Sequence, residues 1–285
     1  MRFFCYKRPI IHTQFIKAFY NIRHNCSKSG GRAFMPITVF KRYEKKFLVT
    51  YDQYRMLMDF LTDYMTFDRY CVDEKVYGLL NVYYDTPDNI LIGRSTDQPL
   101  YKEKLRLRSY FPPENNDSTV FFEIKQKYKG IVTKRRIVMR YGEALEFTET
   151  GKAPKLADDS YMNVQVAYEI EQMFKRYPGL APAVFIAYDR MAMFGKEDKE
   201  LRLTFDKNIK VRRENPTFEY GTDGDEILPE GKLLMEIKIP DAMPLWLARF
   251  LSENKIFNSS FSKYGKEYEY RIKGKQAIDH IESEE

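Results

Sequence analysis

The chain has 285 residues, of which 44% are hydrophobic and 15% aromatic, so it is long enough to bury one large core rich in β-structure. Its net charge of +6 arises in residues 1–35, which hold seven Lys or Arg and no acid, so the remainder is nearly balanced at −1. This balance excludes overall charge as an argument for nucleic-acid binding. No apolar run approaches the roughly 20 residues of a membrane span, and Cys71 alone beyond residue 35 leaves no internal disulfide there.

The predicted organisation is one folded domain between two charged ends. Residues 1–35 form a basic leader outside the fold, interpreted as upstream sequence ahead of a start at Met35 or as a transit-like segment. Residues 36–273 form the domain, and residues 274–285 form an acidic tail. Sparse cysteines favour a reducing compartment, and the predicted location is the cytoplasm or the cytoplasmic face of a membrane.

From Thr38 onward, alternating side chains predict strands separated by a few helices. The strands are expected at residues 39–50, 79–85, 101–110, 119–128, 131–140, 183–193, 200–213 and 232–239. Turn residues at 112–117 and 129–130 make their flanking strands antiparallel neighbours. Apolar stripes predict helices over 54–65, 166–177 and 243–251, packed on the outside of the sheet. The predicted class is α+β, an eight-stranded antiparallel closed β-barrel with external helices.

The parity of charged residues predicts which side of the sheet they occupy, because strand side chains alternate between faces. Lys102, Lys104, Arg106 and Arg108 share one face, and Leu105 and Leu107 share the other. The same alternation gives the following members of the charged face: Glu44, Lys46, Glu123, Lys125, Lys127, Lys134, Arg136, Tyr188, Arg190, Arg202, Thr204, Asp206, Glu236 and Lys238.

A solvated outer face is the ordinary interpretation of such alternation. The cationic bias on three adjacent strands argues against it, because like charges opposed across strands are destabilising. If the charged face lines a barrel interior, the cations need an anion, and a linear phosphate chain suits a lining of Arg forks and Lys point charges. Glu44, Glu123, Asp206 and Glu236 offer hard oxygen ligands to Mg²⁺ or Mn²⁺, with salt bridges to neighbouring Lys or Arg as the alternative.

The ordered motifs RYEKKF, KLRLR, FFEIK, AYDR, LRLTFD, LMEIK and FSKY resemble those of the VTC domain, the polyphosphate polymerase module of the vacuolar transporter chaperone family. That family belongs with the triphosphate tunnel metalloenzymes of CYTH-like fold. The resemblance covers about residues 36–270. It implies an eight-stranded tunnel in which ATP is bound through its phosphates, and transfer of the γ-phosphoryl group to a growing polyphosphate chain with manganese or magnesium.

The resemblance also implies roles for individual residues. It assigns catalysis to Arg106, Arg108, Lys125, Arg190 and Arg202 and phosphate binding to Lys46, Lys134, Lys238 and Lys263; parity adds Lys104, Arg136 and Tyr188 to the phosphate contacts. Glu236 is the expected metal ligand, with Glu44 and Glu123 as further candidates. The expected partners are ATP, inorganic polyphosphate and a membrane protein that receives the product, and the sequence does not predict an oligomeric state.

Two departures keep other functions open. Related tunnel hydrolases begin with Glu-x-Glu-x-Lys, whereas Arg42, Glu44 and Lys46 stand here, which favours the VTC branch. The best-known polymerases carry Lys just before FSKY, and here that position is Ser260. The alternatives are a tunnel triphosphatase or nucleotide hydrolase, and a non-catalytic module that binds polyphosphate or a nucleotide.

Other site types are excluded or disfavoured. One body cysteine and His280 in the acidic tail give neither a nucleophilic triad nor a zinc site. No Gly-x-x-x-x-Gly-Lys loop is present, so phosphate binding by a P-loop is excluded. A nucleic-acid partner is not expected, because an interior charged face cannot admit a duplex and aromatic residues do not interleave with the cations as in a base-stacking platform.

Overall fold

A computed structural model describes residues 43–71, 76–97, 100–129 and 131–273, with side chains to Arg271. The predicted leader and acidic tail lie outside these residues, as does Arg42. Within the described residues, no helix is long and apolar enough to span a membrane.

The described part is built on one antiparallel sheet of ten strands, eight of them on a main path in the order β1-β10-β8-β7-β3-β4-β5-β6. The main-path strands are β1 (Tyr43–Thr50), β3 (Tyr77–Asp85), β4 (Tyr101–Ser109), β5 (Thr119–Tyr128), β6 (Ile131–Arg140), β7 (Ala181–Gly195), β8 (Arg202–Arg212) and β10 (Lys232–Ile239). The short strands β2 (Met65–Phe67) and β9 (Asp225–Glu226) pair with β7 and β8. All eight predicted strands are therefore present, and the two short ones were not predicted.

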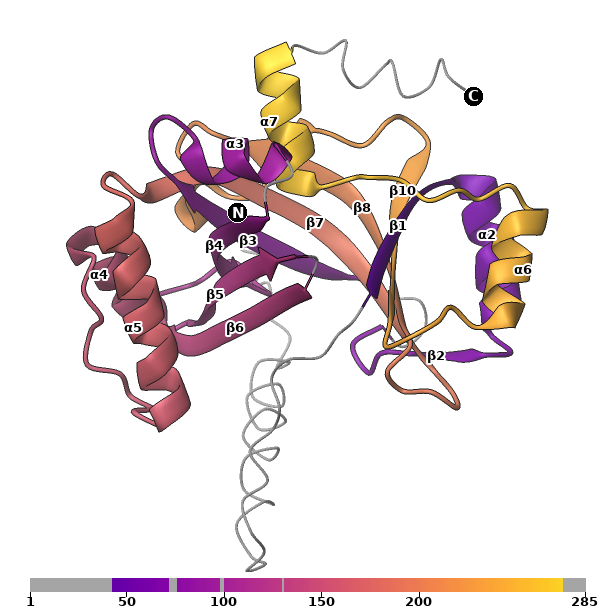
Figure 1. The fold of residues 1–285 in the computed structure, drawn as a ribbon, viewed down its shortest axis with the longest axis horizontal. Coiled ribbons are helices and arrows are strands. Elements are labelled where there is room, and N and C mark those ends of the chain that lie inside the picture. The colour runs from indigo at the N-terminus through magenta and orange to yellow at the C-terminus, as the bar shows by residue number, and fades with distance from the viewer. Residues whose placement is uncertain (1–42, 72–75, 98–99, 130, 274–285) are drawn as a thin grey trace, which may run out of the picture. The chain divides into compact units, whose positions relative to one another are not determined.

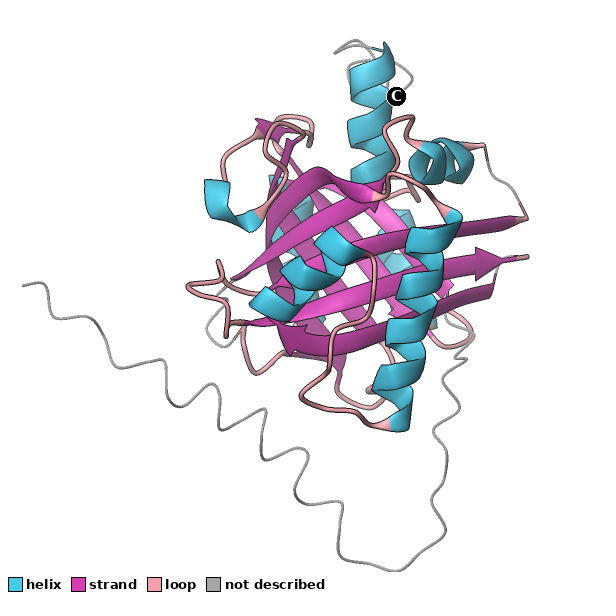
Figure 2. Ribbon diagram, turned by 90° about the vertical axis from the view of Figure 1, so that its left-hand side faces the viewer, coloured by secondary structure: helices cyan, strands magenta, loops and turns pink. Residues whose placement is uncertain are grey.

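Two pairs of helices cover the outside of the sheet (Figures 1 and 2). The helices α4 (Tyr141–Thr150) and α5 (Tyr161–Arg176) lie over the half that contains β4, β5 and β6, and α2 (Tyr51–Leu61) and α6 (Leu245–Glu253) lie beside β1 and β10. The remaining helices are α3 (Ile90–Thr96), α7 (Lys263–Lys273) and the 3₁₀ turn η2 (Phe218–Tyr220).

The outer face of the sheet is apolar, as the alternation predicts. Leu105 and Leu107 of β4 are buried in one cluster with Phe147 of α4 and Ile170 of α5. A second cluster joins the outward residues of β1, β8 and β10 to α2 and α6. Because burial of apolar area stabilises by about 25 cal/mol per Å², this face must be covered, and the charged residues are left on the inner side. There they adjoin a third apolar cluster, in which Leu79, Ile186 and Leu234 pack with Tyr264 of α7.

The sheet curls until its two ends approach each other. Lys125 Nζ on β5 lies 3.7 Å from Glu44 Oε2 on β1, although these strands stand near opposite ends of the main path. The backbone N–H of Ser259, in the segment before α7, donates to the Lys46 carbonyl at 2.6 Å and covers the edge of β1. No pairing between β1 and β6 occurs among the described strands, so the curled sheet is not closed by hydrogen bonds and the predicted closed barrel is not confirmed.

The three predicted helices exist, and the first ends earlier than expected. The stripe over 54–65 predicted one helix, but α2 ends at Leu61 and Met65 begins β2. Tyr64 leaves the helix to stack on Trp246 of α6, with ring centroids 4.2 Å apart. The periodic pattern extended the predicted helix too far because the ring of Tyr64, which continues the apolar stripe, packs on α6 from outside α2.

The unpredicted helix α7 is fixed by one buried carboxylate, Asp85. Its oxygens accept hydrogen bonds from the backbone N–H groups of Leu91 and Ile92 in α3, at 2.8 and 2.9 Å. Asp85 Oδ2 also accepts a bond from the hydroxyl of Tyr264 in α7 at 2.8 Å. This contact places Lys263, the first residue of α7, over the inner face of the sheet.

Candidate functional site

The charged residues of neighbouring strands share the inner face of the sheet. In the β4–β5 ladder Arg106 lies opposite Glu123, Lys104 opposite Lys125 and Lys102 opposite Lys127. In the β1–β10 ladder Lys46 lies opposite Glu236. Directly opposed residues project from the same face, so the register confirms the parity argument.

The most buried group of charges is the Glu236 cluster, made of Lys46, Arg190, Asp206, Glu236 and Lys263. Arg190 forms a two-pronged contact with Asp206, with Nε–Oδ1 at 2.6 Å and Nη2–Oδ2 at 2.7 Å. Lys263 Nζ lies 2.5 Å from Asp206 Oδ2 and 3.1 Å from Glu236 Oε1. Lys46 Nζ reaches the same Glu236 oxygen at 3.8 Å. Strands β1, β7, β8 and β10 and helix α7 thus meet at this point.

The cluster holds Glu236 ionised. Burial by itself would raise the pKa of Glu236, but Lys263, Lys46 and Arg190 outweigh it and hold that pKa well below its usual range. Burial would also lower the pKa of Lys263, and Asp206 and Glu236 raise it instead. Beside this cluster the hydroxyl of Thr204 and Nε of Arg202 are buried without a hydrogen-bond partner. Such orphaned polar atoms are costly, and a polar ligand would satisfy them.

A second group, the Glu123 cluster, contains Tyr83, Arg106, Glu123 and Lys134. Arg106 Nη2 lies 2.6 Å from Glu123 Oε2, and Lys134 Nζ lies 2.6 Å from Glu123 Oε1. Arg106 also donates from Nη1 to the Tyr83 hydroxyl at 3.0 Å. Both oxygens of this carboxylate are therefore engaged by basic side chains, and burial opposed by Arg106, Arg108 and Lys134 leaves the pKa of Glu123 lowered.

Arg108 and Tyr188 connect the two clusters. Arg108 Nε donates to the side chain of Asn81 at 2.8 Å, and its Nη2 donates to the Tyr188 hydroxyl at 3.1 Å. The ring of Tyr188 lies 4.5 Å from Lys263 Nζ and 5.2 Å from Arg190 Cζ. Arg108 is 7% exposed, and among the described residues its side chain bonds only to the neutral groups of Asn81 and Tyr188, while Glu123 acts on its charge without forming an ion pair.

Four lysines on this face, Lys102, Lys104, Lys134 and Lys238, have lowered pKa values. Burial lowers the pKa of Lys104 and of Lys238 to about 8, and nearby cations add to the effect in both cases. Burial together with Arg106 and Arg108 lowers the pKa of Lys134 to about 7, although Glu123 acts in the opposite direction. The lowered pKa values mean that protonating all of these lysines at once is unfavourable. A multiply charged anion bound among them would relieve both the repulsion between the cations and the cost of their burial.

The remaining predicted residues lie nearer the rim of the inner face. Lys125 is 46% exposed, and its ion-pair partner within the described ranges is Glu44. Arg136 is exposed, with Cζ 5.1 Å from the ring of Phe121. Arg202 lies with Cζ 5.0 Å from the ring of Phe194 and Nη2 4.0 Å from Asp68. Because β6 is an edge of the sheet, solvent reaches the side chains of β5 and β6 more easily than those at the centre.

The carboxylates suit a metal that binds together with phosphate better than one held by protein alone. Among the residues that the structure describes, no three His, Cys, Asp or Glu side chains gather as a metal site. Glu44 and Glu236 are electrostatic neighbours, since Glu236 acts to raise the pKa of Glu44. Burial also acts to raise it, and Lys125 and Lys46 overcome both and lower it to about 2. Two ionised carboxylates plus substrate oxygens and water is a coordination that Mg²⁺ accepts.

Several contributing residues were not assigned from the sequence. Asp206 was offered with the other acids as a metal ligand or a salt-bridge partner but was left out of the assigned site, and it makes short contacts with Arg190 and Lys263. Tyr83 and Asn81 hold Arg106 and Arg108. Their inward parity was available in the sequence of β3, but uncharged polar residues among apolar ones give no signal of an electrostatic site.

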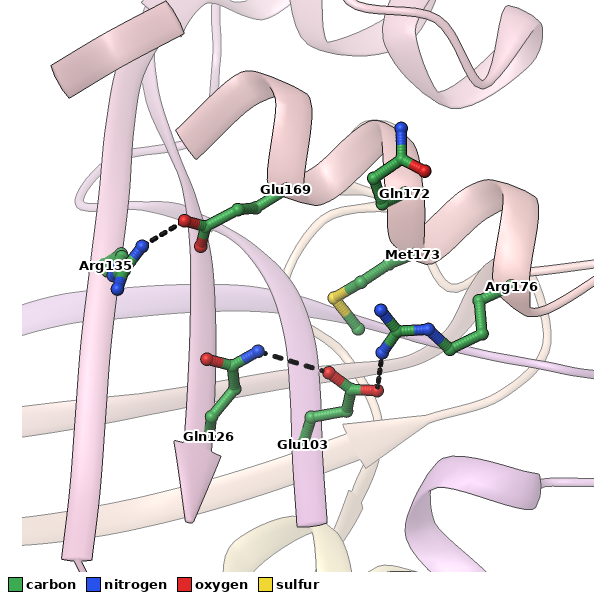
Figure 3. Close-up of a pocket in the computed structure, with 7 residues that line it drawn as sticks. All are labelled: Glu103, Gln126, Arg135, Glu169, Gln172, Met173 and Arg176. Atoms are coloured by element: carbon green, nitrogen blue, oxygen red, sulfur yellow. Dashed lines mark hydrogen bonds and ion pairs between the residues drawn. The ribbon is translucent and has the colours of Figure 1, made fainter. Parts of the chain in front are cut away.

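A separate polar cavity of about 220 Å³ lies on the outward side of the sheet, beneath α5 (Figure 3). Its buried carboxylate, Glu103, accepts hydrogen bonds from Tyr177, Arg176 and Tyr101 at 2.6, 3.1 and 2.6 Å. Glu103 is an odd-numbered residue of β4, so its side chain lies on the face of the sheet opposite to the charged one. These contacts fasten the end of α5 to the sheet, and the cavity is distinct from the inner face.

Comparison with protein families shows which family the chain belongs to. A sequence model of the VTC domain matches residues 41–271, and the chain therefore belongs to the VTC domain family. The resemblance seen in the motifs is confirmed. Membership supports a tunnel protein that acts on polyphosphate or triphosphate, and it does not by itself distinguish polymerisation from hydrolysis.

Two solved structures are similar in fold at low sequence identity. One, from Bacillus halodurans and described as a candidate adenylate cyclase, has 15% identity and a TM-score of 0.47, covering 77% of this chain and 92% of its own. The other, HpAC1 from Hippeastrum, is described as a candidate adenylyl cyclase with a dominant triphosphatase activity. It has 17% identity and a TM-score of 0.43, covering 80% of this chain and 94% of its own. Comparison with curated protein sequences gives no match.

Proposed function

We propose that this protein is a polyphosphate polymerase-like phosphotransferase that moves the γ-phosphoryl group of ATP onto a growing polyphosphate chain. The observation that carries the proposal is the convergence of basic side chains from β1, β4, β5, β7, β10 and α7 on one face of a curled sheet. Several of these cations, Arg108 and Lys104 among them, have no carboxylate partner in the described part of the chain. A linear polyanion supplies the missing negative charge along the whole length of the face.

The chemistry requires positioning and charge neutralisation, with no protein nucleophile. A terminal oxygen of the polyphosphate acceptor attacks the γ-phosphorus of ATP, a new P–O bond forms, and the bond from the γ-phosphorus to the β–γ bridging oxygen breaks. ADP leaves with that oxygen. Arg106, Arg108 and Arg190 supply planar forks to the phosphates, and each is already oriented by a second side chain.

Bound phosphate would rearrange the two clusters. In the described contacts, Lys46 and Lys263 both hold Glu236, and Lys134 and Arg106 both hold Glu123. Phosphate oxygens compete with those carboxylates for the same cations. We therefore assign Lys46, Lys134, Lys238 and Lys263 to phosphate binding, with Lys104, Lys125, Arg136 and Arg202 lining the path toward the rim and Tyr188 orienting Arg108 from the centre of the face.

A divalent ion, Mn²⁺ or Mg²⁺, fits this scheme as a group that enters with the nucleotide. Glu236 and Glu44 are the residues that would hold it, because their oxygens lie 3.1–3.8 Å from the neighbouring cations, whereas each oxygen of Glu123 has a cation at 2.6 Å and Glu123 fits less well. When bound, the ion would supply positive charge that neutralises the phosphates. The protein's own residues bind, orient and screen the substrate.

The proposal is tested by incubating the protein with ATP, manganese and a short polyphosphate primer and measuring primer length and ADP release. Wild-type protein should lengthen the primer, and Arg108→Ala and Glu236→Gln should reduce the rate by 100-fold or more, since electrostatic groups at such sites contribute about 10²–10³ in rate. Arg176→Ala, on the outward face, is the matched control and should be as active as wild type. Equal activity in Arg108→Ala would refute the assignment.

The products separate the alternatives. Release of inorganic phosphate with shortening of triphosphate would identify a hydrolase, and binding without turnover would identify a non-catalytic module. Ser260→Lys tests the departure from the polymerase motif. Because Ser260 is exposed and lies beside the segment that covers β1, we expect the added lysine to raise elongation modestly and not to create it.

A further inference from the structure

A row of aromatic rings crosses one end of the inner face. Ring centroids are 6.3 Å apart for Tyr70 and Tyr77, 6.2 Å for Tyr77 and Tyr110, and 5.4 Å for Tyr110 and Phe121. The three tyrosines are partly exposed and Phe121 is buried. They come from the segment before β3, from β3, from the end of β4 and from β5, so the row is a product of the fold.

The aromatic row is continuous with the arginines of the site. Tyr77 lies directly opposite Arg190 in the β3–β7 ladder, and Phe121 lies directly opposite Arg108 in the β4–β5 ladder. Directly opposed residues share a face, so both rings are on the inner side. Tyr110 follows Arg108 by two residues, in the bend just after β4, so its ring lies within about 7 Å along the chain from Arg108, comparable with the length of one ribose.

The row is neutral and well suited to stacking. Burial raises the pKa of Tyr77 to about 12 although Arg190 and Arg202 act to lower it, so its phenol stays uncharged at neutral pH. The guanidinium of Arg136 stands 5.1 Å from the ring of Phe121 and borders the row with a cation. Phosphate gains nothing from aromatic faces, whereas a flat heterocycle does, by about 1–3 kcal/mol per stacked base.

The other end of the inner face has a different character. There Lys102 lies opposite Lys127, and Lys104 lies opposite Lys125, so lysines face lysines across two strands. Tyr101 and Tyr128 are also found at that end, but their parity places them on the outward side. At this lysine end the rings of Tyr83 and Tyr264 lie beside Lys104, whereas the other end joins its aromatic row to Arg108 and Arg190, a difference that a symmetric polyphosphate would not require.

We infer that the aromatic row is a nucleobase-binding surface, on which the base of a nucleoside triphosphate stacks while its phosphates extend past Arg108 and Arg190 toward the lysine end. The inference rests on the proposed function, and it adds the orientation of the nucleotide. The acceptor chain then occupies the lysine end. Because stacking accepts any flat base, the surface favours nucleoside triphosphates over inorganic triphosphate without selecting strongly between adenine and guanine.

The test compares ATP, GTP and inorganic tripolyphosphate by isothermal titration calorimetry on wild type, Tyr110→Ala and Tyr110→Phe. Wild type should bind ATP and GTP with similar affinity, and both more tightly than tripolyphosphate. Tyr110→Ala should weaken ATP binding roughly tenfold, within the range for loss of one stacked base, and change tripolyphosphate binding less than twofold. Tyr110→Phe retains the ring and should match wild type.

The test has a control variant, and the results that would refute the inference differ from those that would refute the proposed function. Tyr161→Ala removes a tyrosine that is 78% exposed on α5 and should leave every affinity unchanged. Equal weakening of ATP and tripolyphosphate in Tyr110→Ala, or no weakening of either, would overturn the inference while leaving the proposed function intact. Failure of wild type to bind all three ligands would instead refute the proposed function, and the inference with it.

Discussion

Lys238 is expected to destabilise the ligand-free protein while serving the site. Burial lowers its pKa to about 8, and this value already includes the attraction of Glu236 and Glu44. Replacing it by Met retains the aliphatic stem and removes the charge. We therefore predict that Lys238→Met is more stable than wild type at pH 7 and binds tripolyphosphate more weakly.

The magnitude follows from the pKa shift. A lysine with a pKa near 10.5 in the unfolded chain and about 8 in the fold costs up to about 3 kcal/mol when protonated, at 1.36 kcal/mol per pKa unit. Partial exposure of the side chain reduces this to about 1–3 kcal/mol, or roughly 2–10 °C in Tm for a domain of this size. The cost is fully present below pH 8 and disappears as the pH rises toward 10.5, because the folded state then binds fewer protons than the unfolded one.

Thermal denaturation of wild type and Lys238→Met between pH 6 and pH 10 checks this reasoning. The difference in Tm should be largest at pH 6–7 and should shrink steadily above pH 8. Lys199→Met, which removes an exposed lysine in the β7–β8 loop, is the matched control and should shift Tm little at any pH. If Lys238→Met is less stable than wild type at pH 7, or if the difference in Tm does not depend on pH, the proposed cost of protonating Lys238 in the folded state is refuted.

Two further predictions concern the Glu123 cluster. Desolvation of the partly buried Tyr83 alone would raise its pKa, but Arg106 and Lys104 lower it to about 8; absorbance titration should show one tyrosine ionising near pH 8 in wild type and none there in Tyr83→Phe. Glu123→Gln leaves Arg106 and Lys134 without their shared carboxylate, and breaking such a buried pair costs about 3–5 kcal/mol, so Tm should fall by several degrees and tripolyphosphate should restore much of the loss. An unchanged Tm would mean that this pair is not buried as described.

Strand alternation predicted the sheet because a strand buried on one face must alternate. All eight main-path strands were identified, and the inward parity of Arg106 and Glu123 agrees with their direct opposition across β4 and β5. The short strand β2 was missed because its three residues give no period of their own. Its Met65 was absorbed into the preceding helical stripe.

Local sequence patterns could not predict whether the sheet closes, nor where helix α7 lies. Periodicity says nothing about whether two edge strands meet, and here the segment around Ser259 covers the edge of β1. The position of Lys263 depends on Tyr264 bonding to Asp85, two residues that are distant in sequence. Only the family resemblance named Lys263 as a site residue, and in the structure its Nζ lies 3.1 Å from Glu236 Oε1.

The division of the charges into two clusters was likewise beyond sequence reasoning. Parity places Asp206, Glu123 and Glu236 on one face, but it does not predict which Lys or Arg side chain forms an ion pair with each of them. The pairing depends on strand order, which puts β8 between β7 and β10 and sets Asp206 opposite Arg190. That order joins residues from opposite ends of the chain.

The most direct test of the account is calorimetric titration of tripolyphosphate into the wild-type protein in two buffers of different ionisation enthalpy at pH 8. If the inner face is one anion site containing lysines with pKa values near 8, binding should be one-to-one, and protons should be taken up as Lys104 and Lys238 become fully charged. Arg108→Ala should bind at least tenfold more weakly. Absence of saturable binding, or binding with no proton uptake and no loss in Arg108→Ala, would contradict the convergence of these cations on a shared ligand.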